Sequence, residues 1–268
     1  MRRILSLVTK IILLVVCCWG TQALADDQAV SVPVLVYHRF DPTVPGSMTI
    51  NTAKFAAQMQ WLKDNHYTVI PLKTLVDYLL GKGAPPPPKS VVITADDGRD
   101  SVYKYMFPVI RKYNYPVTLF IYPSAISNAS YALTWEQLQE MRQTGLFDIQ
   151  GHTYWHPNFK QEKKKLTPEE YQKLVEIQLV KSKERLEKKL GIQVTLLAWP
   201  YGIYDDYLEQ QAAKAGYLMA FSIDGRNTKK TDNAMAQPRY MIVQSESMAD
   251  FAAIIEGHAQ GKSKGTEA

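Results

Sequence analysis

The chain has 268 residues, of which 46% are hydrophobic and 21% are charged, and its formal net charge is +5. This composition is ordinary for one large α/β domain with a substantial core, and it excludes an intrinsically disordered chain. The first 25 residues hold three basic and no acidic residues, so without them the basic count falls from 31 to 28, against 26 acidic residues. That near balance argues against a nucleic-acid-binding protein.

Residues 1–25 have the organisation of a secretory signal peptide. Basic residues precede the apolar run IILLVVCC, and the small-residue sequence ALA is followed by DDQ. We predict cleavage after Ala25 and a secreted or periplasmic mature protein without an integral membrane segment. An uncleaved membrane anchor is the alternative, although the apolar run is short for a span. Both cysteines, Cys17 and Cys18, lie in this leader, so the mature chain would have no thiols.

Short β-branched runs alternate with helical patterns along the rest of the chain. Strands are expected at 32–37, 67–70, 91–95, 116–121, 147–150, 194–198, 218–223 and 240–243. This alternation predicts an α/β fold, a distorted parallel (β/α) barrel of about seven or eight strands. We expect one domain over 26–260, followed by a polar tail at 261–268.

Three helices carry recognisable signals. These are a shared helical face at Phe55, Met59, Leu62 and His66, a capping box at Thr134 and Gln137 ahead of a helix ending at Gly145, and a helix opened by Thr167, Pro168 and Glu170 that stops at Gly191. The basic stretch 160–165 is expected to be a solvated loop leading into a helix. The proline run at 85–88 is expected to be a stiff loop within the domain.

Chemically reactive side chains follow four of the expected strands. They are His38 after 32–37, Asp96 and Asp97 after 91–95, His152 and His156 after 147–150, and Pro200 and Tyr201 after 194–198. In a parallel barrel the carboxyl ends of the strands share one face, where active sites are built. Polar residues favour strand ends in any case, but so many on one rim indicate a site.

The sequence GHTYWHP at 151–157 places His152 and His156 four residues apart. Alone, such a histidine pair is more often structural. With a carboxylate on the same rim it makes a three-ligand site for a divalent metal such as zinc, with a position open for water. We therefore predict Asp97 as the third ligand and Asp96 as the general base that takes a proton from water.

The motifs TADDG at 94–98, HTYWHP at 152–157 and WPYG at 199–202 resemble those of the polysaccharide deacetylases, the NodB-homology domains of carbohydrate esterase family 4. The resemblance extends over roughly the whole chain after the leader. It implies metal-dependent removal of N-acetyl groups from an amino-sugar polysaccharide. It also implies the same roles for Asp96, Asp97 and the two histidines, and that the backbone N–H of Tyr201 helps to hold the oxyanion.

The chain departs from the family pattern in two places. The C-terminal Leu-x-His motif that supplies the general acid in many relatives is absent. The opening YHRF instead resembles the branch that includes poly-β-1,6-N-acetylglucosamine deacetylases, which implies His38 as the acid. The arginine that many members carry before PYG is also replaced, by LLAW. Arg239 either orients Asp96 in its place or is a rim residue paired with another acid.

Flat side chains near the expected metal site could bind sugar, since sugar rings present C–H faces that stack on such surfaces. The predicted substrate contacts are Trp155, Trp199, Pro200 and Arg239. The bland alternative is that some of these residues only fill the barrel mouth. Two other functions remain open, an O-acetyl esterase and a catalytically inactive carbohydrate-binding protein. Retention of Asp96 argues against the second, because a binder needs no base.

Overall fold

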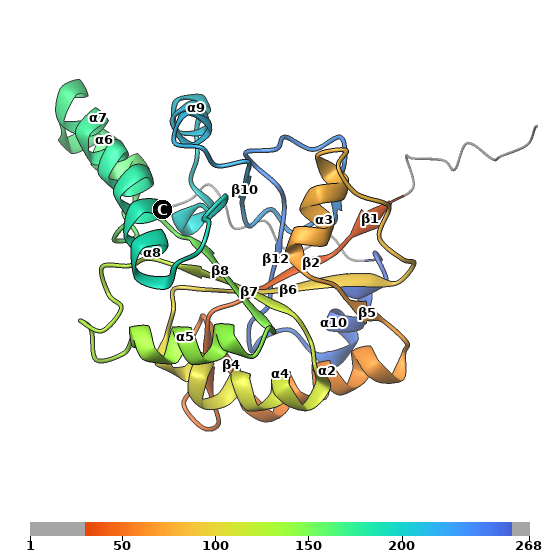
Figure 1. Ribbon diagram of the computed structural model, residues 1–268. Helices are drawn as coiled ribbons and strands as arrows, with labels where there is room; N and C mark the ends of the chain where they lie inside the picture. The colour runs from red at the N-terminus through yellow and green to blue at the C-terminus, as the bar shows by residue number, and fades with distance from the viewer. Residues whose placement is uncertain (1–29, 259–268) are drawn as a thin grey trace, which may run out of the picture. The chain divides into compact units, whose positions relative to one another are not determined.

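The computed structural model describes residues 30–258 (Figure 1). The predicted leader at 1–25 and the predicted tail at 261–268 lie outside the described residues. The strands are β1 (Ser31–Val32), β2 (Val34–Tyr37), β3 (Arg39–Asp41), β4 (Thr49–Asn51), β5 (Thr68–Val69), β6 (Ser90–Asp96), β7 (Val117–Ile121), β8 (Phe147–Gly151), β9 (Leu196–Ala198), β10 (Met219–Phe221), β11 (Thr228–Lys229) and β12 (Tyr240–Met241).

Helices connect most of these strands. They are α2 (Thr52–Asp64), α3 (Leu72–Leu79), α4 (Phe107–Tyr113), α5 (Trp135–Gln143), α6 (Phe159–Lys165), α7 (Pro168–Glu176), α8 (Ser182–Leu190), α9 (Asp206–Lys214) and α10 (Met248–Ile255). Two π-helical turns, η2 (Val102–Met106) and η3 (Ile177–Lys181), and one 3-10 turn, η4 (Pro200–Gly202), complete the set. Of the helices in residues 30–258, none combines the length and apolar character needed to cross a membrane.

The main sheet is parallel and runs in the order β10-β9-β8-β7-β6-β2-β12, while β5 pairs with the start of β6. All the predicted strands are present, so the predicted α/β architecture is confirmed, as a curled half-barrel. Backbone hydrogen bonds of 2.8 Å, from Ser222 to Gln237 and from Gln237 to Ala220, join β10 to the segment before β12. Because the strands are parallel, their carboxyl ends lie at one edge of the sheet.

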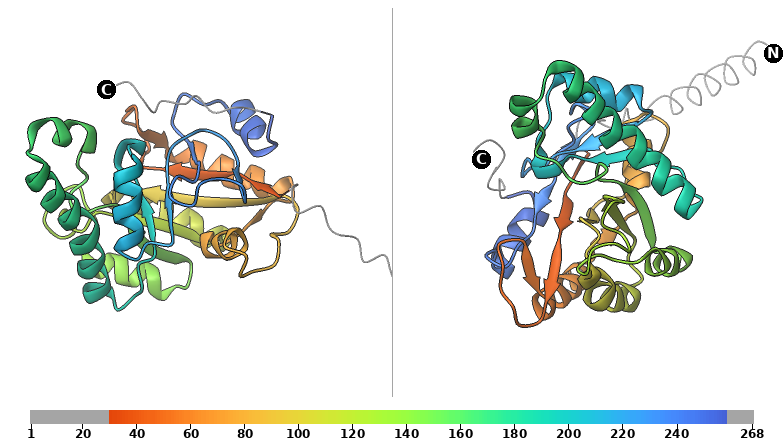
Figure 2. Two further views of the ribbon diagram at one scale, coloured as in Figure 1. Left: turned by 90° about the horizontal axis from the view of Figure 1, so that it is seen from above. Right: turned by 90° about the vertical axis from the view of Figure 1, so that its left-hand side faces the viewer.

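Helices cover the sheet and supply the rest of the core. In Figure 1, α5, α4 and α2 lie in a row along one side of the sheet. Figure 2 shows α7, η3 and α8 as one long helical segment at an end of the sheet. Buried apolar side chains of the strands, such as Leu35, Ile93 and Leu119, pack against those of the helices. This packing fixes the strand ends that carry the reactive residues.

Two predicted helices are confirmed by their caps, and two local predictions were wrong. The capping boxes at the starts of α5 and α7 are present, and the long helical segment ends at Gly191, with φ 62°. His66 does not belong to the helical face, because α2 ends at Asp64 and His66 has φ 59°. The basic stretch 160–165 is helical, in α6, because the side chain of Asn158 caps this segment.

Candidate active site

The three predicted metal ligands meet at the carboxyl edge of the sheet. One donor atom from each of Asp97, His152 and His156 lies within 4.8 Å of the others. The Oδ1 atom of Asp97 is 3.6 Å from Nε2 of His152 and 3.7 Å from Nε2 of His156. The strand ends therefore bring together residues from two separate motifs, as the sequence predicted.

The histidines present their Nε2 atoms in a way that suits a metal. Nδ1 of His152 lies 2.8 Å from the carbonyl oxygen of Ala198, so this nitrogen carries a proton and Nε2 is left for a ligand bond. Burial, and then the nearby His152, lower the pKa of His156 to about 4. At neutral pH its imidazole is therefore uncharged, which is the form that binds a metal. The donor set of two nitrogens and one oxygen fits zinc.

The ADDG motif separates its two carboxylates by a sharp change of backbone direction. Asp96 ends β6, whereas Asp97 has φ 74° and Gly98 has φ 72°, both in the left-handed region. A Cβ atom at Gly98 would lie 2.9 Å from Cδ1 of Ile121, so glycine is required there both for its φ and for its small size. This turn gives the adjacent aspartates different partners.

Asp96 is held by Arg239, which comes from the segment just before β12. Nη1 of Arg239 donates to Oδ1 of Asp96 at 2.9 Å, and Nη2 donates to Oδ2 at 2.7 Å. Burial by itself raises the pKa of Asp96, but the guanidinium of Arg239 overrides this effect and holds that pKa below its usual value. Of the two alternatives left by the sequence for Arg239, the structure contains the contact with Asp96.

The guanidinium of Arg239 is fixed by further bonds. Its Nε atom donates to the carbonyl oxygen of Ser222 at 3.0 Å, and Nη1 also reaches the hydroxyl of Thr94 at 3.2 Å. The side chain is 0% exposed. Its predicted place among the substrate contacts is therefore corrected, because it is buried beneath Asp96.

The loop that carries the two histidines is held by a residue that sequence reasoning missed. Oε1 of Gln178 accepts hydrogen bonds from the backbone N–H groups of Tyr154, at 3.0 Å, and Trp155, at 3.1 Å. Gln178 is fully buried and lies in the π-helical turn η3. Such turns inside helices often occur at functional sites. Nothing in the helical sequence pattern distinguishes this glutamine from its neighbours.

The WPYG motif forms another turn with left-handed backbone. Tyr201 has φ 57° and Gly202 has φ 67°, and a Cβ atom at Gly202 would lie 2.6 Å from Cγ1 of Ile223. This backbone directs the Tyr201 ring towards the predicted metal ligands, with its centroid 4.6 Å from that of His156. The ring is 55% exposed. It is thus available to a ligand that approaches His156.

The remaining predicted substrate contacts divide by exposure. Trp155 is 43% exposed, consistent with a contact surface. Trp199 is 1% exposed and its indole N–H donates to the carbonyl oxygen of Met235 at 2.8 Å, and Pro200 is also buried. The predictions of direct contact for Trp199 and Pro200 are corrected, because both residues pack inside the protein.

A tyrosine after β7 also lies beside the predicted metal ligands, and the sequence pattern did not single it out. The ring centroid of Tyr122 is 5.6 Å from that of His156. Its hydroxyl is 3.1 Å from that of Tyr131, a ring that is partly exposed and lies under the guanidinium of Arg99. Its position directly after a buried strand is the signal that could have found it.

His38 follows β2 and lies near the same carboxylates. Burial lowers the pKa of its imidazole, while the charges of Asp96 and Asp97 act to raise it. Its Nδ1 atom is buried and has no hydrogen-bond partner among the described residues. An unpartnered buried nitrogen is costly unless a ligand or a reacting group completes it. His38 therefore brings a neutral imidazole with spare bonding capacity to the site.

Comparisons with known proteins agree with this arrangement. A family model described as polysaccharide deacetylase matches residues 83–220. The poly-β-1,6-N-acetyl-D-glucosamine N-deacetylase of Staphylococcus aureus strain MRSA252 is 28% identical in an alignment 199 residues long, which covers 72% of this chain and 68% of that protein. The protein of the same name from Escherichia coli K12 is 24% identical in an alignment 241 residues long, which covers 76% of this chain but only 35% of that protein. Among solved structures, IcaB from Ammonifex degensii has a TM-score of 0.71 and 26% identity, with 87% of this chain and 99% of that chain covered.

Proposed function

The chain belongs to the polysaccharide deacetylase family of hydrolases, and we propose that it removes N-acetyl groups from the amino sugars of a polysaccharide, in a metal-dependent reaction. The observation that carries this proposal is the Asp97, His152 and His156 cluster beside an aspartate that an arginine holds ionised. The names of the Staphylococcus aureus and Escherichia coli relatives support poly-β-1,6-N-acetylglucosamine as the substrate class.

Asp97, His152 and His156 would hold one divalent ion, and their mixture of nitrogen and oxygen donors favours zinc. When bound, such an ion supplies Lewis-acid chemistry at the acetyl carbonyl and promotes ionisation of water. Asp97 brings negative charge to the cluster, because its pKa is low: burial acts to raise it, but the neighbouring histidines outweigh burial. A charged carboxylate is the form that a metal ligand requires.

Asp96 is proposed as the general base. It would accept a proton from the attacking water while the water oxygen bonds to the acetyl carbon. The two hydrogen bonds from the guanidinium of Arg239 keep this carboxylate ionised and fix the direction of its oxygens, so that Asp96 is available as a base at neutral pH. Orientation matters because a general base must lie within hydrogen-bond reach of the proton that it takes.

The other proposed roles belong to Tyr201 and His38. The backbone N–H of Tyr201, in the strained turn of WPYG, would donate to the oxyanion of the tetrahedral species. As the C–N bond breaks, His38 would take up the proton that Asp96 removed from water and pass it to the departing amine, which leaves acetate and a free amino sugar. The exposed rings of Trp155 and Tyr201 would support the sugar face.

We also propose that the protein is exported, on the pattern of basic residues, apolar run and small-residue site in residues 1–25. The mature chain would begin at Asp26 and would be secreted or periplasmic. The intact mass of the protein from its native host tests this proposal. A full-length mass in the membrane fraction would contradict cleavage and favour an anchored enzyme.

The function is tested with three sets of acetylated oligomers: β-1,6-linked N-acetylglucosamine, chitin-type β-1,4-linked N-acetylglucosamine, and O-acetylated xylan. The purified, metal-reconstituted protein should release acetate and new free amines in equal amounts from the first set. Acetate from xylan alone would show an O-acetyl esterase, and no acetate from any set would favour a binding protein. Chelation should abolish activity and added metal should restore it, whereas full activity in an ion-free preparation would overturn the metal assignment.

A further inference from the structure

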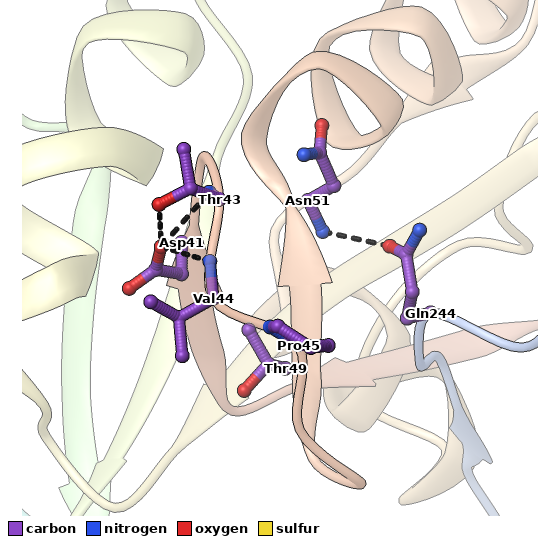
Figure 3. A pocket seen from close by; sticks show the side chains of 7 residues that line it. All are labelled: Asp41, Thr43, Val44, Pro45, Thr49, Asn51 and Gln244. Atoms are coloured by element: carbon purple, nitrogen blue, oxygen red, sulfur yellow. Dashed lines mark hydrogen bonds between the residues drawn. The ribbon is translucent and has the colours of Figure 1, made fainter.

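Two pockets are lined by residues other than the predicted metal ligands, and they differ in whether their polar groups already have hydrogen-bond partners. The smaller, of about 70 Å³, is lined by residues of β3, β4 and the loop between them (Figure 3). There Asp41 accepts hydrogen bonds from Thr43 and Val44, and the backbone N–H of Asn51 donates to Gln244. Because these polar groups already have partners and the space is small, this pocket has no evident need of a ligand.

The larger pocket, of about 270 Å³, lies where the chain leaves the two motifs of the active site. One wall is α6, which begins shortly after His156, and the other is the segment from Ile203 to Leu208, which directly follows η4 and leads into α9. Figure 1 shows α6 and α9 on the same side of the sheet. A polymer bound across His156 and Tyr201 could therefore continue into this pocket.

The interior of the larger pocket is apolar and contains one orphan hydroxyl. Phe159, Ile203 and Leu208 form apolar surface, and Tyr171 lines the same space. Tyr171 is 5% exposed, and its hydroxyl oxygen is buried without a hydrogen-bond partner among residues 30–258. Buried hydroxyls nearly always have a partner, so this one indicates a place for a polar group of a ligand.

The mouth of this pocket carries unneutralised positive charge from α6. Lys163 pairs with Asp205 at 2.7 Å, and the other oxygen of Asp205 caps α9 by accepting from the N–H of Leu208. Lys160 and Lys164 line the pocket, are exposed, and have no acidic partner within the described part of the chain. The positive charge at the mouth therefore exceeds the negative charge, which favours an anionic ligand.

We propose that the larger pocket is a subsite for a sugar ring that carries a carboxylate, within the polymer whose amino sugars reach the metal site. Phe159 and the neighbouring apolar surface would pack on the C–H face of the ring, and the hydroxyl of Tyr171 would bond to a ring hydroxyl. Lys160 and Lys164 would pair with the carboxylate. The placement of the polymer rests on the proposed function, and the subsite predicts that an amino-sugar polymer with acidic units binds more tightly than neutral poly-N-acetylglucosamine.

The probes are two hexasaccharides of equal length. A hyaluronan hexasaccharide alternates N-acetylglucosamine with glucuronate, and chitohexaose is its neutral counterpart. Calorimetric titration of the metal-loaded protein should show about tenfold tighter binding of the hyaluronan probe at low salt, and added salt should reduce this preference. Equal affinity for the two probes, with deacetylation of neutral oligomers retained, would overturn the subsite and leave the proposed function standing.

Variants locate the effect. The double change Lys160→Ala and Lys164→Ala should remove most of the preference for the hyaluronan probe, a loss of about tenfold in its affinity. The matched control is Lys173→Ala with Lys188→Ala, two exposed lysines that do not line the pocket. Tyr171→Phe should weaken the hyaluronan probe without changing the salt dependence, since it removes a hydroxyl and no charge. The same loss in the control pair would show a diffuse charge effect and would overturn the proposal.

Discussion

The adjacent carboxylates of the ADDG motif belong to two halves of the site that are supported in different ways. The half around Asp97 depends on local backbone geometry, with left-handed residues at Asp97, Thr153 and His156. The half around Asp96 depends on one long-range ion pair, with Arg239, inside the sheet. The Asp97 half is therefore shaped by loops that a few hydrogen bonds hold in place. The Asp96 half is shaped by a buried ion pair in which each charge neutralises the other.

This difference predicts different sensitivities. A buried ion pair that loses one partner leaves an uncompensated charge, so substitutions at Arg239 should strongly destabilise the half around Asp96, which we call the base half; the half around Asp97 is the metal half. The metal half has three predicted ligands and a loop that several hydrogen bonds support. Ser182 donates to the Thr153 carbonyl at 2.7 Å, and the N–H of His156 donates to the Thr153 hydroxyl at 3.2 Å. Loss of one of these hydrogen bonds should therefore lower the metal affinity moderately without abolishing metal binding.

The largest effect is expected from Asp96→Asn, which should remove the function of the base half and leave the metal half intact. The amide cannot accept the proton of the attacking water, so turnover should fall by about 10²- to 10⁴-fold. The metal should remain, because Asp96 is not one of the three clustered donors. Steady-state acetate release and elemental analysis of the same preparation test this. If metal and activity were lost together, the roles assigned to Asp96 and Asp97 would be reversed.

The residues that meet at the candidate site could be predicted because each follows a buried strand in a short contiguous motif. The residues that support them could be predicted only in part, since the sequence left two alternatives for Arg239 and did not single out Gln178. Whether Arg239 bonds to Asp96 depends on the order of β12, β2 and β6 across the sheet, which no local pattern reveals. Gln178 acts from a π-helical turn, and its sequence reads as ordinary helix. The sequence therefore predicted which residues meet at the candidate site, while the order of the sheet and the irregular helix determine how these residues are held.

Burial was the other quantity that the sequence could not supply. Trp199 and Trp155 are both tryptophans beside a reactive motif, yet one is buried and bonded to Met235 while the other is partly exposed. Residues 160–165 were expected to be a loop because of their charge, but the cap at Asn158 starts a helix there. Local charge and aromatic character do not determine which face of an element meets the core.

His38→Ala tests whether a residue outside both the metal half and the base half protonates the leaving group. If His38 protonates the amine, deacetylation should slow by about a hundredfold with metal content unchanged. The loss should be smaller on an activated acetyl ester, whose leaving group hardly needs a proton. His66→Ala is the matched control, because His66 is exposed beyond the end of α2. An equal loss on both substrates would indicate a positioning role, and near-normal deacetylation would exclude His38 as the acid.

The smallest effect is expected from Gln178→Leu, which perturbs the metal half alone. Leucine cannot accept the N–H bonds of Tyr154 and Trp155, so the loop would hold its histidines less firmly, although no ligand is changed. Loss of such supporting bonds typically costs about 10- to 100-fold in metal affinity, which competition with a chromophoric chelator measures. At saturating metal, turnover should return close to that of the unaltered protein, because Asp96 and Arg239 are untouched.

Two further variants serve as controls. Gln178→Glu keeps an acceptor oxygen and should recover much of the metal affinity, while Gln172→Leu, on the exposed face of α7, controls for the change of side chain in a helix. Unchanged metal affinity in Gln178→Leu would show that the backbone of the loop holds the histidines without help from η3, and the contrast between the two halves would then rest on Arg239 alone.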